Sequence, residues 1–421
     1  VLADPPKLLL DEPGLRLWHK LDATFKMPRT VALFRLSSPA LHRSASATAA
    51  GHLMIRLVGD VLNEAAYLAD VAGLHYHIVQ QGVAGIEIRV EGFSHKLHLL
   101  CRRVFEALAS GRFTEAAFER EREALLRKYR NTNTQVSKHI NYNRLLALCA
   151  STYHAEQLLV ELEKMTLADV IAHKAAMVAN CHLEAMVHGN VTADEARSLA
   201  LDSAKAALGA GCSAPPSVRR REQCVRLPDG VELVHTEPAK NPEDENAGLE
   251  VYLQCCEASS YSDRAHVDLL DQILGEPCYN QLRTKEQLGY TVYSGMRLTH
   301  GVLGFCFGVV SGNAPSEVLA ERVEAFLAGG AAEVLEKMTD EEFVKHRQAL
   351  QTIKLQQDRN LHDEAMRHWD HVWNQRYHFL TREKELQALD GATADSTREW
   401  FARYIAASAP QRRKLAVHVQ P

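Results

Sequence analysis

Two side chains in the segment Asn280–Ser294, NQLRTKEQLGYTVYS, could do chemistry together. Arg283 is a permanent cation with several fixed N–H donors, and Tyr290 is a phenol that donates a hydrogen bond at any pH well below its pKa of about 10. The two residues are two helical turns apart, so they could lie side by side and hold a negatively charged group. The alternative is an ordinary helix end, with Arg283 paired to a carboxylate and Tyr290 packed in a sheet.

The elements that must position this pair can be read from the same segment. Asn280–Leu288 is predicted to be helical, and Gly289 is predicted to be the left-handed residue that ends the helix. Tyr290–Tyr293 is predicted to begin the next strand.

The same succession of elements occurs twice in the chain. A strand pattern at Thr30–Pro39 has a counterpart at Gly248–Cys256, and each is followed by a helix, a strand pair and further helices. Gly73 matches Gly289 at a shift of 216 residues (289 − 73), and Phe118 matches Phe343 at 225 (343 − 118). Two residues are predicted to cap matching helices, Thr114 and Thr339. LEAMVHGNV, residues 183–191, echoes KLAVHVQP at the end of the chain.

A period of this length indicates two copies of one domain. We predict an α+β fold with two tandem homologous domains, each an antiparallel β-sheet packed with α-helices. The first repeat covers residues 1–212, the linker SAPPSVRRR covers 213–221, and the second repeat covers 222–421. The opening VLADPPKLLLDEPG has similar proline content, and we expect it to be the tail of another linker.

Composition excludes some classes of function. The net charge of −5 and the absence of a basic block argue against binding to nucleic acid. No apolar run reaches the roughly 18 residues of a membrane span. The nine cysteines form no CxxC motif, which is typical of reduced thiols in a cytoplasmic protein, with an organelle as the alternative. The chain begins with Val1, so we expect that the true N-terminus is missing.

Several blocks together resemble a known family. They are LNEAAYLADVAGL (62–74), EPCYNQLRTKEQLGYTVYSG (276–295), RVEAFL (322–327) and RRKLAVHV (412–419). They resemble the C-terminal half of peptidases of the insulin-degrading-enzyme type, in the pitrilysin (inverzincin, M16) family of metallopeptidases. The resemblance covers essentially the whole chain. It implies that the two repeats are the third and fourth of four homologous domains, which close like a clamshell around a peptide.

The resemblance places the zinc ion in the N-terminal half. None of the 21 histidines begins the family motif H-x-x-E-H or the related H-E-x-x-H. A catalytic domain would have the motif in a helix that here contains a single histidine in each repeat, His52 in the first and His266 in the second. We therefore expect this chain to bind no cofactor and to be inactive alone, and to work with a catalytic half in the same polypeptide or a separate subunit.

Two histidine clusters are alternative metal sites. HDEAMRHWDH (362–371) places His368 and His371 at helical spacing, but a fourth ligand at fixed spacing is missing. The other interpretation is a polar helix face around a packed Trp369. His75 and His77 share one face of a strand and are interpreted as strand surface.

The resemblance also implies roles for individual residues. Residues matching Arg283 and Tyr290 reach the substrate near the scissile carbonyl, and Tyr279 would help to line the pocket after the scissile bond. A phenol and a guanidinium suit the stabilisation of an oxyanion. At the matching places the first repeat has Tyr67 and Leu74, so the fold itself does not require Arg and Tyr there.

The chain also departs from the family. Where relatives have a lysine cluster associated with polyanions, residues 352–362 contain only Lys354 and Arg359, so a strong phosphate site is doubtful. Arg219–Arg221 is interpreted as a solvated linker.

Two functions remain open at this point. The chain is either the non-catalytic half of a zinc endopeptidase that degrades peptides in a closed chamber, or a metal-free structural or binding subunit of the same fold. The presence of Arg283 and Tyr290 favours the first. Expected partners are the catalytic half and peptide substrates, with a homodimer open; nucleic acid and membranes are not expected.

Overall fold

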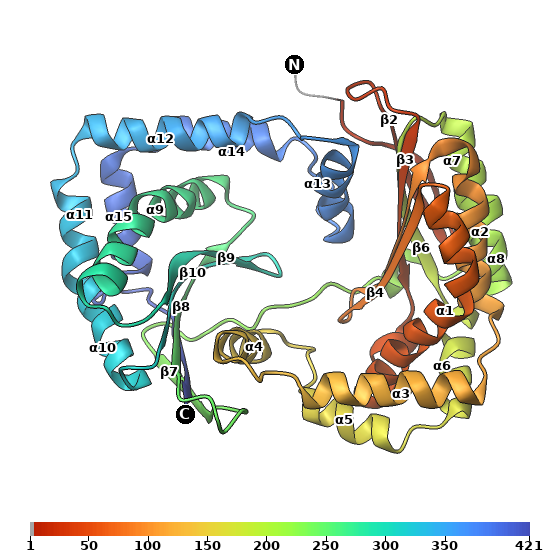
Figure 1. The fold of residues 1–421 in the computed structure, drawn as a ribbon. Helices are drawn as coiled ribbons and strands as arrows, with labels where there is room; N and C mark the ends of the chain where they lie inside the picture. The colour runs from red at the N-terminus through yellow and green to blue at the C-terminus, as the bar shows by residue number, and fades with distance from the viewer. Residues whose placement is uncertain (1–3) are drawn as a thin grey trace. The chain divides into compact units, whose positions relative to one another are not determined.

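Residues 4–421, described by a computed structural model, fold into two compact units (Figure 1). The first unit consists of residues up to Asn131, Ser151–Glu222 and Gln357–Phe379. The second consists of Thr132–Ala150, Gln223–Gln356 and Leu380–Pro421.

The first unit is built on a six-stranded sheet with the strand order β1-β2-β6-β3-β5-β4. The strands are β1 (Lys7–Glu12), β2 (Leu15–Leu21), β3 (Arg29–Ser37), β4 (Leu74–Gln81), β5 (Gly85–Phe93) and β6 (His182–Gly189). The helices are α1 (Ala45–Val71), α2 (Ser94–Ser110), α3 (Glu115–Arg130), α5 (Ala155–Glu163), α6 (Leu167–Ala179), α7 (Ala193–Ser198), α8 (Ala206–Leu208) and α13 (Leu361–Trp373).

The second unit is built on a five-stranded sheet with the order β7-β11-β8-β10-β9. The strands are β7 (Glu232–Pro238), β8 (Ala247–Glu257), β9 (Thr291–Thr299), β10 (Val302–Ser311) and β11 (Lys414–Gln420). The helices are α4 (Val136–Leu148), α9 (Tyr261–Tyr279), α10 (Ser316–Ala325), α11 (Ala332–Lys337), α12 (Asp340–Leu355), α14 (Thr381–Gly391) and α15 (Ala394–Tyr404).

The two sheets have the same topology once β1 is set aside. β2, β6, β3, β5 and β4 of the first unit correspond in order to β7, β11, β8, β10 and β9 of the second. The predicted α+β fold and its repetition are therefore confirmed. The sheets are not purely antiparallel, because β2 runs parallel to β6 and β7 runs parallel to β11.

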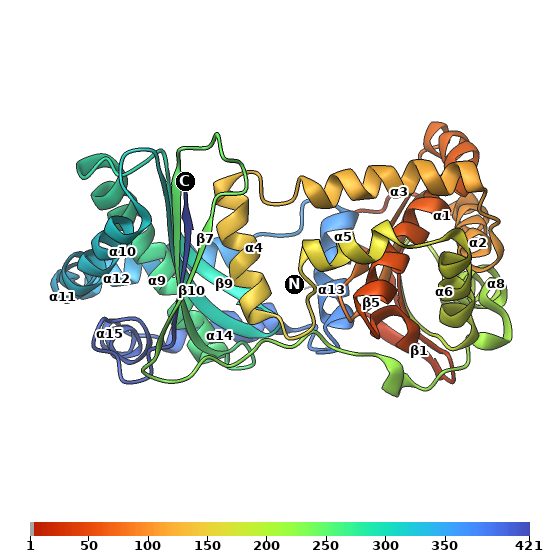
Figure 2. The same cartoon turned by 90° about the horizontal axis from the view of Figure 1, so that it is seen from below.

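Each sheet has helices on both faces. In the second unit, α9 and α4 lie on opposite faces of the sheet, which both views show (Figures 1 and 2). The larger apolar core lies on the α9 side, and a smaller one forms where Val136 and Ile140 of α4 pack on the sheet. In the first unit, α1 and α2 cover one face and α13 covers the other, where Ala365 and Trp369 are buried.

The two helices α4 and α13 are exchanged between the repeats. They occupy matching places in the sequence, since Val136 and Leu361 are 225 residues apart (361 − 136), the same shift as Phe118 and Phe343. Yet α4, from the first repeat, packs in the second unit, and α13, from the second repeat, packs in the first. The compact units therefore do not coincide with the predicted ranges 1–212 and 222–421.

Two segments predicted to be linkers are part of the first unit. Val1–Ala3 lie outside the described residues, but Lys7–Glu12 forms β1, which makes a hairpin with β2 through Pro13 and Gly14 (φ 79°). Arg219 was expected to be solvated. Its side chain is instead largely covered, and its Nη1 atom lies 2.5 Å from the carboxylate of Glu184.

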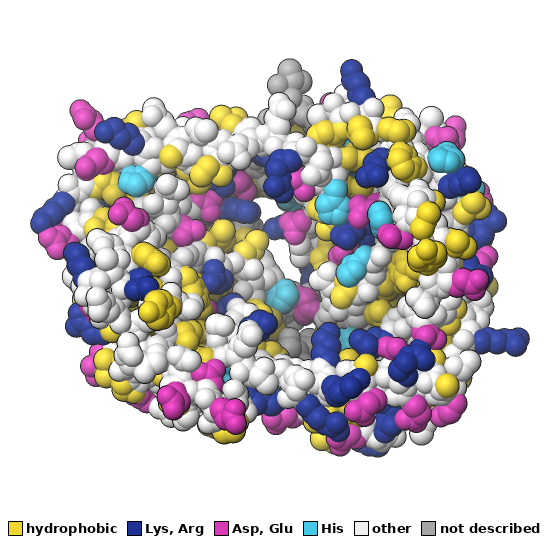
Figure 3. All heavy atoms as spheres, in the orientation of Figure 1, with side chains coloured by type: hydrophobic (Ala, Val, Ile, Leu, Met, Phe, Trp, Pro, Cys, Tyr) yellow, Lys and Arg dark blue, Asp and Glu magenta, His cyan; other side chains and the backbone are white. Residues whose placement is uncertain are grey.

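The described surface is polar and mixed in charge. On the face drawn in Figure 3, acidic and basic side chains are interspersed. Among the helices of residues 4–421, none combines the length and the apolar composition that crossing a bilayer would require.

Candidate functional site

The candidate site begins where α9 changes its geometry. After Tyr279 the helix continues without a break into a π-helical segment, Asn280–Lys285, which contains Arg283. π-helical turns within α-helices are often found at functional sites, but residues 4–421 contain two others, Leu199–Lys205 and Phe326–Ala331, so the turn alone decides nothing.

The two helices and the strands after them match at compatible shifts. The N-caps of α1 and α9, Ser44 and Ser260, are 216 residues apart (260 − 44). Leu74 of β4 packs in the core beneath α1, and Val292 of β9 packs in the core beneath α9. Because neighbouring residues of a strand face opposite sides, the two edge strands must match at an even shift, which the shift of 216 satisfies.

The predicted match of Gly73 with Gly289 has the same shift as the two caps (289 − 73 = 216). At this shift Leu74 corresponds to Tyr290.

The turn after the π-helical segment differs from the prediction. Gly289 is not left-handed; the residue with positive φ is Gln287 (φ 54°). Gly289 is needed for a different reason, since a Cβ atom there would lie 2.0 Å from the carbonyl oxygen of Val310. The strand begins at Thr291, so Tyr290 precedes the sheet and is not part of it.

Arg283 and Tyr290 lie against each other. The guanidinium carbon Cζ of Arg283 is 4.7 Å from the centroid of the Tyr290 ring, which is cation–π geometry. Tyr290 is 90% exposed. The Nε atom of Arg283 is buried without a hydrogen-bond partner, and no carboxylate among residues 4–421 pairs with the guanidinium. The structure therefore does not show the ordinary arrangement of a paired arginine and a sheet-packed tyrosine.

Tyr279 lies at the last residue of α9, four positions before Arg283. It is half exposed and is not a core residue. Within the described residues it makes no hydrogen bond or ring contact with Arg283 or Tyr290, so the structure brings together two of the three predicted site residues.

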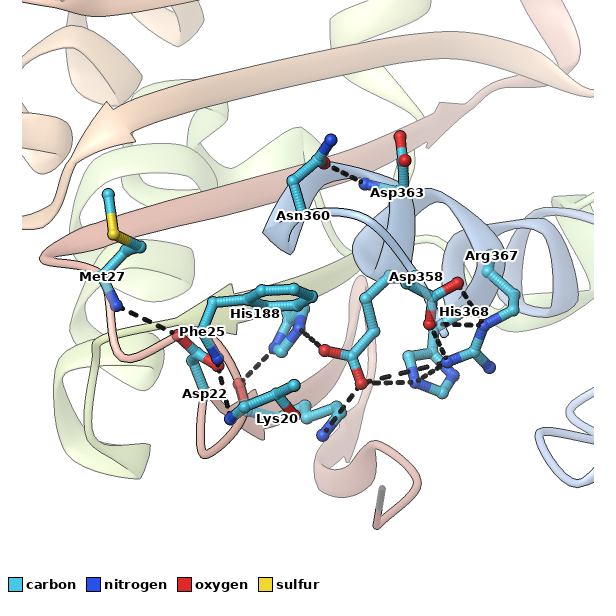
Figure 4. A network of polar contacts seen from close by, with 12 residues as sticks. Lys20, Asp22, Phe25, Met27, His188, Asp358, Asn360, Asp363, Arg367 and His368 are labelled. Atoms are coloured by element: carbon cyan, nitrogen blue, oxygen red, sulfur yellow. Dashed lines mark hydrogen bonds and ion pairs between the residues drawn. The ribbon is translucent and has the colours of Figure 1, made fainter. Parts of the chain in front are cut away.

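The histidine-rich helix α13 forms an ion network in the first unit (Figure 4). Glu364 accepts from Nε2 of His188 at 3.1 Å and lies 3.4 Å from Nζ of Lys20. Burial raises the pKa of Glu364, but hydrogen bonds from His188 and His368 outweigh burial and hold it well below the usual range. Burial lowers the pKa of His368 to about 4.

This network does not fit a metal ion. Lys20 and Arg367 already place cations next to Glu364, and a metal would have to displace them. Within residues 4–421, no group of three His, Cys, Asp or Glu side chains is arranged to hold a metal.

The two histidines of the helices α1 and α9 have structural partners. His52 contacts the Tyr129 hydroxyl at 2.6 Å, and His266 contacts Oγ1 of Thr397 at 3.1 Å. His75 and His77 lie exposed on β4, as predicted.

The two basic residues of segment 352–362 are both paired with carboxylates. Lys354 pairs with Asp268 and Glu385, and Arg359 pairs with Asp363. Neither side chain is left as an unpaired cation for a polyanion.

Sequence comparisons identify the family. Residues 2–161 match the middle or third domain of peptidase M16, and residues 269–369 match the C-terminal lobe domain 4 of PqqF-like PQQ synthases. A nardilysin-like protein of Arabidopsis thaliana is 33% identical over 99% of this chain, and human insulin-degrading enzyme is 32% identical over 98%. The chain belongs to the M16 peptidase family. It spans 40% of the length of each of these two relatives.

Solved structures agree on the fold. Pitrilysin superposes with a TM-score of 0.88 at 24% identity, with 99% of this chain and 43% of that chain covered. A peptidase M16 inactive domain from Pseudomonas fluorescens superposes with a TM-score of 0.73 at 14% identity, with 99% and 98% covered. The chain thus corresponds to a non-catalytic half of an M16 peptidase. A further relative, from Schizosaccharomyces pombe, is named a putative zinc protease and is 28% identical over 98% of this chain.

Proposed function

We propose that this chain is the C-terminal half of a zinc metalloendopeptidase, and that Arg283 and Tyr290 contact the peptide at the scissile bond. A catalytic half, in the same polypeptide or in a separate subunit, supplies the zinc ion, which activates the attacking water. Peptides are degraded inside a chamber that the two halves close together. Tyr279 lines the pocket that receives the residues after the scissile bond.

The observation that supports this proposal is an exposed phenol above an unpaired guanidinium. Burying the Arg283 Nε atom without a hydrogen bond costs about 1–3 kcal/mol, which the stacking of the guanidinium on the Tyr290 ring offsets only in part. Leaving a large aromatic side chain such as Tyr290 exposed gains nothing for the fold. Such costs are typical of groups that are kept for a ligand rather than for stability.

The chemistry of the pair suits an acyl transition state. When the scissile carbonyl is attacked, its oxygen gains negative charge, and N–H and O–H donors aimed at that oxygen stabilise it. A tyrosine hydroxyl can donate a hydrogen bond, and the cation beneath the Tyr290 ring adds a fixed positive charge. Both donors come from one short segment of the chain, so a single turn positions them together.

The test is Tyr290→Phe in the enzyme assembled from this chain and its catalytic half. We expect kcat to fall by the order of 10²-fold while KM changes much less, because the lost donor acts only in the transition state. The measurement is steady-state hydrolysis of a fluorogenic peptide at several concentrations.

Tyr67→Phe is the matched control. Tyr67 is also an exposed tyrosine at the end of the equivalent helix, α1, and its substitution should leave both constants unchanged. If Tyr290→Phe retains kcat within about twofold in a folded, assembled enzyme, the oxyanion role is wrong. The metal-free structural subunit would then be the better interpretation.

A further inference from the structure

The turn that presents Tyr290 has an unusual construction. Residues 286–290 belong to no helix or strand. Two backbone hydrogen bonds close the turn, from Glu286 N to Gln281 O at 3.0 Å and from Leu288 N to Leu282 O at 3.1 Å. Between them, Gln287 is left-handed, which costs a non-glycine residue about 1–2 kcal/mol. Such a turn persists only where its surroundings fix it.

The carboxylate of Glu286 makes several of the contacts that hold the turn in place. The Glu286 side chain accepts from Nε and Nη2 of Arg322 at 2.6 and 2.8 Å, and from Nε2 of Gln281 at 2.7 Å. A two-point arginine–carboxylate pair of this kind is strong and fixes orientation. The hydrogen bond from Arg322 also lowers the pKa of Glu286, so the carboxylate stays ionised at neutral pH.

The three partners come from three places in the fold. Gln281 lies in the π-helical segment, Glu286 in the turn, and Arg322 in α10, which packs on the sheet through Leu319 and Val323. The ion pair therefore connects the turn to a helix that is packed on the sheet. Arg283 and Tyr290 stand on either side of Glu286 in the sequence, so they can stack only if the chain between them reverses at this turn.

The equivalent connection in the first repeat is built differently. There α1 ends at Val71, Gly73 takes the left-handed conformation, and β4 begins at Leu74. The contact across this connection, between His75 and Asp70 at 2.8 Å, is exposed to solvent and ties the helix directly to the strand, without an arginine from another helix.

We propose that Glu286 and Arg322 are positioning residues, whose ion pair holds the turn closed so that Tyr290 and Arg283 are presented together. The catalytic part of this proposal rests on the proposed function above. Neither residue touches the peptide; both act through the geometry of Tyr290.

The first experiment uses this chain alone and needs no activity. In Glu286→Gln, hydrogen exchange at the Leu288 amide should become of the order of tenfold faster, because the neutral amide cannot accept both arginine donors as a carboxylate does. Exchange in β8 should not change. The matched control is Glu333→Gln, which removes the exposed ion pair of Glu333 with Lys337 in the same unit and should leave Leu288 unaffected.

The second experiment measures kcat and KM in the assembled enzyme. Glu286→Gln should lower kcat about tenfold with KM changed less than twofold. The charge-reversed double variant, Glu286→Arg with Arg322→Glu, should regain most of the lost kcat and of the Leu288 protection. A residue that only stabilises the fold would show neither the split between kcat and KM nor the rescue.

The outcomes separate the two proposals. Unchanged Leu288 exchange in Glu286→Gln overturns the positioning role. Faster exchange with unchanged kcat also overturns it, provided that Tyr290→Phe lowers kcat in the same assay. If Tyr290→Phe leaves kcat unchanged, the proposed function itself fails, and the catalytic role of the ion pair falls with it.

Discussion

The ends of α1 and α9 show how one fold is used in two ways. Both helices begin at a serine cap and lead to the edge strand of their sheet. α1 ends in a simple glycine turn, whereas α9 passes through a π-helical turn. The second ending includes a left-handed Gln287 and an Arg283 Nε without a hydrogen bond, both of which cost stability. The matching turn of the first repeat, with left-handed Gly73, avoids these two costs.

A second contrast concerns the exchanged helices α4 and α13. His139 of α4 contacts Glu237 of β7 at 3.0 Å, and the matching residue of α13, Glu364 (139 + 225), contacts His188 and Lys20. An acid and a base have thus exchanged places at the same helix position. On the sheet of its own repeat, Glu364 would face the half-buried carboxylate of Glu237. Two facing carboxylates disfavour the unexchanged arrangement.

The largest difference in stability between the two units is expected at acidic pH. Burial lowers the pKa of five histidines of the first unit to about 4, and they are His42, His52, His173, His368 and His371. In the second unit, burial lowers the pKa of His266 and His418.

The sign follows from proton binding. A histidine with a folded pKa of about 4 binds fewer protons than in the unfolded chain, whose histidines have a pKa of about 6.5. Its stabilising contribution is therefore present above pH 6.5 and is lost as the pH falls toward 4. Of these five histidines, only His368 and His371 are buried. Solvent screens the other three, so we expect each histidine to contribute about 1 kcal/mol on average to the stability lost at pH 5.

Between pH 7 and pH 5 the first unit should thus lose about 5 kcal/mol of its free energy of unfolding, and the second unit less. Urea unfolding followed by tryptophan fluorescence measures this in Trp400→Phe, since Trp18, Trp369 and Trp373 belong to the first unit. An equal loss in both units would contradict the contrast.

A smaller loss of the free energy of unfolding is expected when the buried ion pair between Arg144 of α4 and Glu250 is broken. Arg144 pairs with Glu250, which also accepts from the Tyr293 hydroxyl at 2.6 Å. Arg144→Met leaves the Glu250 charge buried without its main partner, so the free energy of unfolding should fall by about 3–5 kcal/mol. Urea unfolding of the full chain measures it.

Lys138→Met is the matched control for that variant. It removes a cation from the exposed side of the same helix and should change stability by less than about 0.5 kcal/mol. Equal effects of the two substitutions would show that the Glu250 pair does not hold α4 in place.

Local patterns in the sequence predicted the succession of elements well. The caps Thr114 and Thr339 and the echo between the last strands, β6 and β11, all appear in the structure. These features depend on neighbouring residues, so a sequence pattern contains them. β1 and β7 were missed because both are largely exposed strands next to prolines, without an apolar alternation.

The exchange of α4 and α13 could not be predicted in the same way. The side chains that each helix contacts on its sheet, such as Glu237 for α4 and Lys20 for α13, lie far away in the sequence. The site was predicted by residue type, but its geometry was not. The role of Glu286 became visible only through its contact with Arg322, although Glu286 stands in a segment that the sequence had marked.

The smallest expected effect compares the helix caps Thr114 and Thr339. Each hydroxyl accepts from a backbone N–H, but only Thr339 has a full capping box, in which Glu342 contacts the Thr339 backbone N–H at 3.0 Å. Thr→Ala should therefore cost about 1 kcal/mol at position 114 and somewhat more at 339, because the second change also frees the Glu342 side chain. Urea unfolding measures both. Adding Glu342→Ala to each variant sharpens the test: the second change should have a smaller effect on top of Thr339→Ala than in the otherwise unchanged chain, and an undiminished effect on top of Thr114→Ala. Strict additivity in both backgrounds would show that the capping box does not distinguish the two matching helices.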